Sequence, residues 1–140
     1  MTIDALIRYF ETLTAQDVAR LSEFYAAHAR FKDPFNDVRG VAAIARIFSH
    51  MFEQLEAPRF VILERVVQGH AAFLVWDFHF GVRIWGRRQE QVIHGSSHLK
   101  FAPDGKVLLH RDYWDTGEEL YQKLPVLGVL MRALRRWMTA

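Results

Sequence analysis

Apolar residues recur at helical spacing three times in the first third of the chain, which predicts three helices. The stripes are Ile3, Leu6, Ile7 and Phe10; then Val18, Leu21, Phe24 and Tyr25; then Ile44, Ile47, Phe48, Met51, Phe52 and Leu55. Thr14 and Asp17 have the spacing of a capping box, so we expect the second helix to start there. The third should begin near Val41, after an extended piece over residues 28–34 and a turn over residues 36–40.

The pattern then changes to segments rich in β-branched and aromatic residues, which predict strands over residues 59–68, 71–82, 89–101 and 106–115. Turn residues around Gly69, Gly86 and Gly105 separate them. Helices followed by an antiparallel meander indicate the α+β class. Residues 117–140 again have helical spacing, interrupted at Pro125.

The strand predicted over residues 71–82 is apolar on both faces, because side chains alternate along a strand. One face carries Phe73, Val75, Asp77 and His79, and the other carries Leu74, Trp76, Phe78 and Phe80. Helices cover only one side of such a sheet, and an uncovered apolar face is unfavourable in water. We therefore expect a homodimer that buries the group pointing outward.

Composition narrows the class of protein. The 140 residues fit one domain spanning residues 1–140, and 51% hydrophobic residues supply a sizeable core. A net charge of +2 gives little reason to expect a nucleic-acid partner, and the absence of cysteine excludes disulfides and thiolate metal sites. The N-terminus lacks the pattern of a secretory signal, and no apolar run is long enough to span a bilayer, so we expect a cytoplasmic protein.

Candidate chemistry lies on the last three predicted strands. Asp77 and His79 share a face, as do His110 and Asp112, and Ser97 lies on the strand between. If these faces all point inward, a carboxylate, an imidazole and a hydroxyl meet in an apolar cavity, where proton transfer near neutral pH is feasible. Asp33, between an extended piece and a turn, is a further carboxylate that can face the same cavity.

A family resemblance rests on several segments that cover about residues 3–116. They are Arg8-Tyr9, Asp17, Leu21, Phe24, Phe31-Lys32-Asp33-Pro34, Gly40-Val41-Ala42-Ala43-Ile44, Gly95-Ser96-Ser97-His98-Leu99-Lys100-Phe101 and Asp104-Gly105-Lys106-Val107. Together they resemble the NTF2-like superfamily, which includes SnoaL-like polyketide cyclases, ketosteroid isomerases and scytalone dehydratase. The resemblance implies a cone in which a strongly curved antiparallel sheet wraps around the N-terminal helices, here with a C-terminal helical extension over residues 117–140.

The resemblance implies that Phe73, Val75, Asp77 and His79 point into the pocket, which leaves Leu74, Trp76, Phe78 and Phe80 as the outer face and the expected dimer interface.

The resemblance also implies roles for individual residues. Asp33 matches the general base of ketosteroid isomerases, Tyr9 matches their oxyanion donor, and Ser97 stands where those enzymes have a protonated carboxylic acid. The catalytic candidates are Asp33, Tyr9, His79, His110 and Asp112. The candidates for ligand contact are Asp77, Ser97, Trp114, Phe31, Phe73, Val75, Leu99 and Phe101.

Structural roles compete with these assignments. Asp33 before a proline is typical of a turn cap, and the hydroxyl of Tyr9 can simply reach solvent. Asp77 and Asp112 can pair with Arg83 or Arg111, or form structural hydrogen bonds with neighbouring histidines. A divalent ion held by Asp77, His79, His110 and Asp112 is a further alternative, but their spacing matches no metal motif and we assign no metal site.

The function that fits these features is acid/base isomerisation, dehydration or cyclisation of a small hydrophobic carbonyl or hydroxyl compound. No phosphate-binding glycine loop or nucleotide fingerprint is present, so no cofactor is expected. A non-catalytic carrier of a hydrophobic ligand and a protein–protein adaptor remain the alternatives.

The tail carries a last apolar stripe, made by Val126, Leu127, Leu130, Met131, Leu134 and Trp137. We expect this helix to cover the mouth of the cavity with Arg132, Arg135 and Arg136 outward, because burial stabilises such a stripe. Contact with an anionic membrane is the less favoured alternative.

Overall fold

The fold is built on one six-stranded sheet, seen in a computed structural model that describes residues 2–119 and 125–139, with only the backbone described at residues 84, 125–128 and 131. The strands are β1 (Tyr25–Lys32), β2 (Asp37–Arg39), β3 (Glu56–Gln68), β4 (Ala71–Ile84), β5 (Arg87–Phe101) and β6 (Val107–Tyr113). Their order is β2-β1-β6-β5-β4-β3, antiparallel throughout except for β1 beside β6. The parallel pair joins the first strand, β1, to the last, β6, so that β1 and β2 extend the curved wall of the cone.

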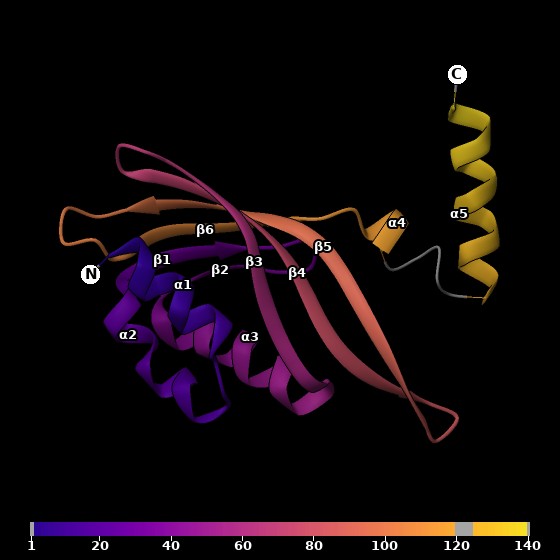
Figure 1. The fold of residues 1–140 in the computed structure, drawn as a ribbon, viewed down its shortest axis with the longest axis horizontal. Helices are drawn as coiled ribbons and strands as arrows, with labels where there is room; N and C mark the ends of the chain where they lie inside the picture. Colours follow the sequence, from indigo (N-terminus) through magenta and orange to yellow (C-terminus); the bar gives the residue numbers. More distant parts are fainter. Residues whose placement is uncertain (1, 120–124, 140) are drawn as a thin grey trace.

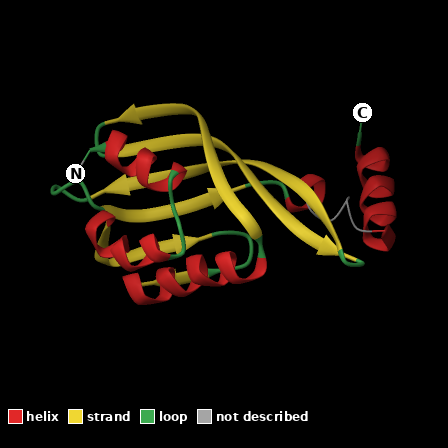
Figure 2. Ribbon diagram, turned by 60° about the horizontal axis from the view of Figure 1, so that its bottom comes forward, coloured by secondary structure: helices red, strands yellow, loops and turns green. Residues whose placement is uncertain are grey.

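Helices cover the concave side of this sheet (Figures 1 and 2). They are α1 (Ile3–Glu11), the 3-10 helix η1 (Gln16–Arg20), α2 (Leu21–Phe24) and α3 (Val41–Gln54). α1 contacts β3, and α3 contacts both β1 and β3. The curved sheet and its helices agree with the cone expected from the sequence.

The elements match the sequence pattern closely, with differences at their ends. The expected capping box is present, because the Asp17 N–H donates to Thr14 Oγ1 (3.3 Å) and the Thr14 N–H donates to Asp17 Oδ2 (3.0 Å). The helix that it starts is short, and Tyr25 already belongs to β1. The turn expected over residues 36–40 contains the short strand β2. The β4–β5 hairpin turns at Trp85-Gly86, as expected around Gly86, and each of the two strands extends two residues further towards the turn than predicted.

The orientation expected for β4 is wrong. Leu74, Trp76, Phe78 and Phe80 point into the cone, where each is at most 9% exposed, and they cannot form the predicted dimer interface. Phe73, Val75, Asp77 and His79 lie on the outer face instead. The physical reason is the cost of burying an ionisable group. The inward set is wholly apolar, whereas the outward set contains a carboxylate and an imidazole.

The C-terminal extension contains α4 (Thr116–Glu119) and α5 (Pro125–Met138). The helical spacing expected over residues 117–140 is thus divided between two helices, and Pro125 is the first residue of α5; residues 120–124, just before the expected interruption at Pro125, lie outside the described residues. α5 stands apart from the sheet (Figures 1 and 2). None of its described residues lines either of the two cavities inside the cone, which contradicts its predicted position over the mouth of the cavity. No helix among the described residues is long and apolar enough to cross a membrane.

Tyr9 joins α1 to η1, because its hydroxyl donates to the backbone carbonyl of Asp17 at 2.6 Å and its ring stacks on Phe24. The side chain is 5% exposed and lines neither cavity of the cone, so its placement does not fit the oxyanion donor implied by the resemblance. Burial, with a smaller contribution from the charge of Asp17, raises the pKa of Tyr9 to about 12.

We predict that Tyr9→Phe lowers the free energy of unfolding by about 1 kcal/mol at neutral pH, because one buried hydrogen bond is lost. A raised pKa in the folded state means that Tyr9 stabilises the fold fully below pH 10 and that this contribution is lost as the pH rises towards about 12. Denaturant titrations at neutral and alkaline pH should therefore show a smaller alkaline loss in the variant. Equal alkaline losses in both proteins would contradict this role for Tyr9.

Candidate functional site

A cavity of about 320 Å³ opens between α3 and the concave face of the sheet. Its walls are mainly aromatic, with rings from Phe31, Phe48, Phe60, Trp76, Phe78 and Trp114. This volume is near the lower end of the range of about 300–1,000 Å³ that is usual for small-molecule sites. The cavity is therefore suited to a compact, largely apolar organic molecule.

Few polar side chains reach this cavity. Asp112 on β6 and Asp33 after β1 contribute carboxylates, while His50 and Gln54 on α3 contribute an imidazole and an amide. A small number of polar groups in an apolar wall is typical of sites that orient a ligand. The two carboxylates and the imidazole of His50 are the groups in this set that can accept a proton.

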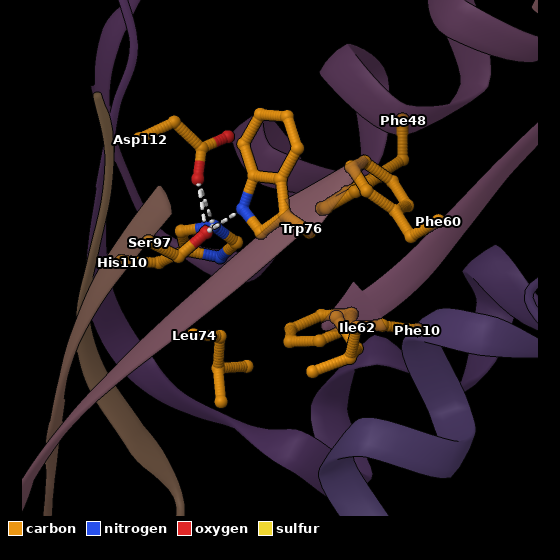
Figure 3. A pocket seen from close by; sticks show the side chains of 9 residues that line it. All are labelled: Phe10, Phe48, Phe60, Ile62, Leu74, Trp76, Ser97, His110 and Asp112. Atoms are coloured by element: carbon orange, nitrogen blue, oxygen red, sulfur yellow. Dashed lines mark hydrogen bonds and ion pairs between the residues drawn. The ribbon is translucent and has the colours of Figure 1, made fainter. Parts of the chain in front are cut away.

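A second, smaller void of about 20 Å³ lies beside the first, large enough for about one water-sized molecule (Figure 3). Ser97, His110 and Asp112 form its polar side. Asp112 and Trp76 line both spaces, so the Asp112 carboxylate lies on the boundary between a polar corner and the apolar cavity.

Two chains of hydrogen bonds end on one oxygen of Asp112. In the first, the Tyr25 hydroxyl lies 2.6 Å from Nδ1 of His110, and Nε2 of His110 lies 2.7 Å from Oδ1 of Asp112. In the second, the indole N–H of Trp76 donates to Oγ of Ser97 at 2.9 Å, and the Ser97 hydroxyl donates to the same Oδ1 at 2.5 Å. The dashed lines of Figure 3 show how these groups from β4, β5 and β6 converge.

One arrangement of protons satisfies every member of the two chains. The indole N–H can only donate, so Ser97 accepts from Trp76 and has its own proton free for Asp112. An ionised Asp112 only accepts, so Nε2 of His110 carries a proton and Nδ1 accepts from Tyr25. Burial raises the pKa of Tyr25 well above its usual value, which keeps this donor protonated.

The second oxygen of Asp112 is available to a ligand. The hydrogen bonds found for this carboxylate among the described residues all involve Oδ1. The Asp112 side chain is 14% exposed, compared with 6% for that of His110. The hydrogen bond from His110 thus orients Asp112 through Oδ1, while Oδ2 remains free to accept a proton from a molecule in the cavity.

Asp33 is more strongly occupied by its own turn. Its Oδ1 accepts the backbone N–H groups of Phe35 (2.8 Å) and Asn36 (2.7 Å), and the side-chain amide of Asn36 reaches both oxygens. These bonds make it the turn cap that was the structural alternative. Asp33 also lines the cavity, but the turn already uses most of the hydrogen-bonding capacity of its carboxylate.

The structure brings only part of the sequence-predicted site together. Ser97, His110, Asp112, Asp33, Phe31 and Trp114 line one or other of the two spaces. Leu99 is buried on the same face without reaching them, and Phe101 contacts the core from near the far end of β5. Asp77, His79, Phe73 and Val75 are on the outer face, so the four-residue metal site considered from the sequence cannot form.

Sequence reasoning missed two residues that orient Asp112. Tyr25 ends an apolar stripe at helical spacing and was therefore assigned to helix packing, although its ring lies in β1 beside His110. Trp76 was placed on the outer face. A signal for Trp76 was available in Gly95, its partner across the strands, because a glycine inside a strand often marks the close approach of another group.

Gly95 makes room for this indole. A Cβ atom at position 95 would lie 2.6 Å from the Trp76 ring, which is closer than such atoms approach. We predict that Gly95→Ala displaces Trp76, breaks its bond to Ser97 and lowers the free energy of unfolding by about 1–3 kcal/mol. Tryptophan fluorescence and denaturant unfolding would measure both effects, with Gly69→Ala, whose Cβ meets no atom within 4 Å, as the control for the environment of Trp76. An unchanged Trp76 environment in Gly95→Ala would contradict this role for Gly95.

The curved sheet and its apolar cavity define the class of cone-shaped proteins with the NTF2-like or ketosteroid isomerase-like fold, as solved structures confirm. A protein assigned as a SnoaL-like polyketide cyclase from Shewanella denitrificans OS-217 is 20% identical, with a TM-score of 0.69 over 86% of this chain and 98% of that one. A protein from Catenulispora acidiphila DSM 44928 with a ketosteroid isomerase-like fold, solved with trimethylamine, is 16% identical, with a TM-score of 0.71 over 89% and 96%. TerC, co-crystallised with polyporic acid, is 16% identical, with a TM-score of 0.69 over 81% and 91%.

The sequence itself identifies the family. Residues 6–110 match the model of the SnoaL-like domain, and the chain belongs to that family. None of the curated proteins matches the sequence at a significant level. The identities to the solved structures are low, so these likenesses establish the fold, and the chemistry must be argued from the site.

Proposed function

We propose that the protein is a small-molecule enzyme that moves a proton on a hydrophobic carbonyl or hydroxyl compound, in an isomerisation, dehydration or cyclisation. The observation that carries this proposal is the Asp112 carboxylate, held through Oδ1 at the edge of an aromatic cavity of about 320 Å³. Fixed dipoles that orient a base before the reaction are what acid/base catalysis requires. Polyketide cyclase-like proteins among the structural neighbours favour the same reading.

The residues divide into two roles under this proposal. Asp112 is the proton acceptor, because it lines the ligand space and its hydrogen bonds among the described residues leave Oδ2 unoccupied. His110 and Tyr25 are positioning residues, since they act through Oδ1 and neither lines the large cavity. A base held in this way can take a proton from a carbon next to a carbonyl group and return it elsewhere, which is the step shared by the three reactions.

Asp112→Asn tests the role of the base without knowledge of the natural substrate. The probe is 5-nitrobenzisoxazole, from which a base removes the ring C–H proton while the N–O bond breaks to give a coloured nitrophenolate. We expect the wild-type protein to accelerate this elimination and Asp112→Asn to slow it by about 100-fold or more. Asp33→Asn is the matched control and should slow it only a few-fold, because the turn already occupies that carboxylate.

Binding of the same probe separates the alternatives. Trp76 and Trp114 line the cavity, so quenching of their fluorescence reports occupancy. Quenching that is equal in wild type and Asp112→Asn, without acceleration above that of free acetate, would reject the enzyme in favour of a ligand carrier. Absence of quenching in both would favour an adaptor whose cavity takes no ligand.

A homodimer remains part of the proposal, with its interface moved to the true outer face. That face exposes Val66, Phe73 and Val92, and an exposed apolar patch on a sheet favours association. Light scattering at micromolar concentration should give the mass of two chains, and Val66→Glu/Phe73→Glu should give the mass of one. A monomeric wild-type protein would contradict the dimer.

A further inference from the structure

The surface that the proposed function leaves unused is α5, which lies at the end of the molecule opposite the N-terminus (Figures 1 and 2). Leu130, Leu134, Trp137 and Met138 are all exposed, and Trp137 is 82% exposed. Their spacing places them on one face of the helix. An apolar face this open is stable in water only if something else covers it.

The charges of α5 are all of one sign. Arg132, Arg135 and Arg136 lie on the face opposite to Leu130 and Leu134, and residues 125–140 contain no acidic side chain. Because the whole chain carries +2, the remaining residues carry −1. Positive charge is therefore concentrated on α5, beside its apolar face, rather than spread over the cone.

A second exposed tryptophan lies at the same end of the molecule. Trp85 forms the tip of the β4–β5 hairpin and is 97% exposed, with the exposed Arg87 directly after the turn. Its φ of 54° is in the left-handed region, where asparagine or glycine is usual and a bulky aromatic residue is strained. Neither packing nor turn geometry explains a tryptophan at this position.

We propose that α5 and the Trp85 turn bind the surface of an anionic phospholipid bilayer. α5 has 14 residues, which span about 21 Å, too short to cross a hydrocarbon core of about 30 Å. It therefore lies in the plane of the surface, with Leu130 and Leu134 below the headgroups and Arg135 and Arg136 beside the lipid phosphates. Trp137 and Trp85 sit at headgroup level, where indole rings are favoured.

Charge complementarity selects lipid over a second copy of the chain. Pairing two α5 helices through their apolar faces would cover those faces but leave Arg135 and Arg136 on the far sides, with no acidic residue in the helix to neutralise them. An anionic lipid surface covers the same face and neutralises the arginines. It also accounts for Trp85, which lies outside the helix.

Flotation with lipid vesicles tests the proposal on the full chain. We expect binding to vesicles of phosphatidylglycerol and phosphatidylcholine, and little binding to vesicles of phosphatidylcholine alone. Arg135→Glu/Arg136→Glu should weaken the binding by about tenfold or more, at about 1 kcal/mol per arginine near the surface. The matched control, Arg39→Glu/Arg46→Glu, makes the same change of charge on the cone and should retain most of the binding.

Two further variants separate the apolar contributions. Leu130→Glu/Leu134→Glu should abolish binding, and Trp85→Asn should weaken it several-fold while keeping a turn residue that accepts a positive φ. Absence of binding to the anionic vesicles, or equal losses in the two arginine pairs, would overturn the proposal. So would light scattering showing that Leu130→Glu/Leu134→Glu separates a dimer that has no affinity for vesicles.

Discussion

The alternation of side chains along β4 decides which residues can meet inside the cone. Leu74, Trp76 and Phe78 all face the helices, and burying each one contributes about 1.5–3 kcal/mol. A shift of one residue would expose these side chains and bury Asp77, whose desolvation costs several kcal/mol. Its outward position gives Asp77 a partner instead, with His94 at 2.7 Å on the same face. The strand register is thus held by both faces at once.

The site depends on this register. Trp76 can reach Ser97 only because both point inward and because Gly95, opposite Trp76, has no side chain. Pairing of β5 with β6 then sets Ser97 beside Asp112, and His110 lies two residues before Asp112 on β6. The backbone of the sheet therefore brings both donors, Ser97 and His110, to one carboxylate oxygen. Few rotatable bonds separate the rigid sheet from Asp112. A base oriented in this way needs little rearrangement when a substrate binds.

Most of the fold could be predicted from local sequence patterns, whereas contacts between distant segments could not. The spacing of two residues between His110 and Asp112 correctly predicts that they share one face of a strand, because that inference needs only alternation. The face of β4 was transferred from a family resemblance, although the ionisable side chains of the outer set argued against it. Tyr25 was hidden because its contact with His110 depends on the parallel pairing of β1 and β6, which joins residues 85 positions apart. No periodicity in the sequence reports such a pairing.

The position of the tail follows from the same balance of burial. The sequence predicts α5 over the cavity because its apolar stripe must be covered. The core of the cone is nevertheless buried without α5, since Leu6, Ile44 and Leu99 are already fully enclosed. Among the described residues, the large cavity is lined by α3, the sheet and the segments next to them, and by no residue of α5. The apolar stripe of α5 must then be covered by an apolar environment other than the cone. A lipid surface is such an environment, and an apolar substrate partitions into the same environment. Under the two proposals, a molecule suited to the aromatic cavity would be concentrated at the lipid surface where α5 binds. α5 has no role in the chemistry, but it would then help to supply the cavity with its ligand.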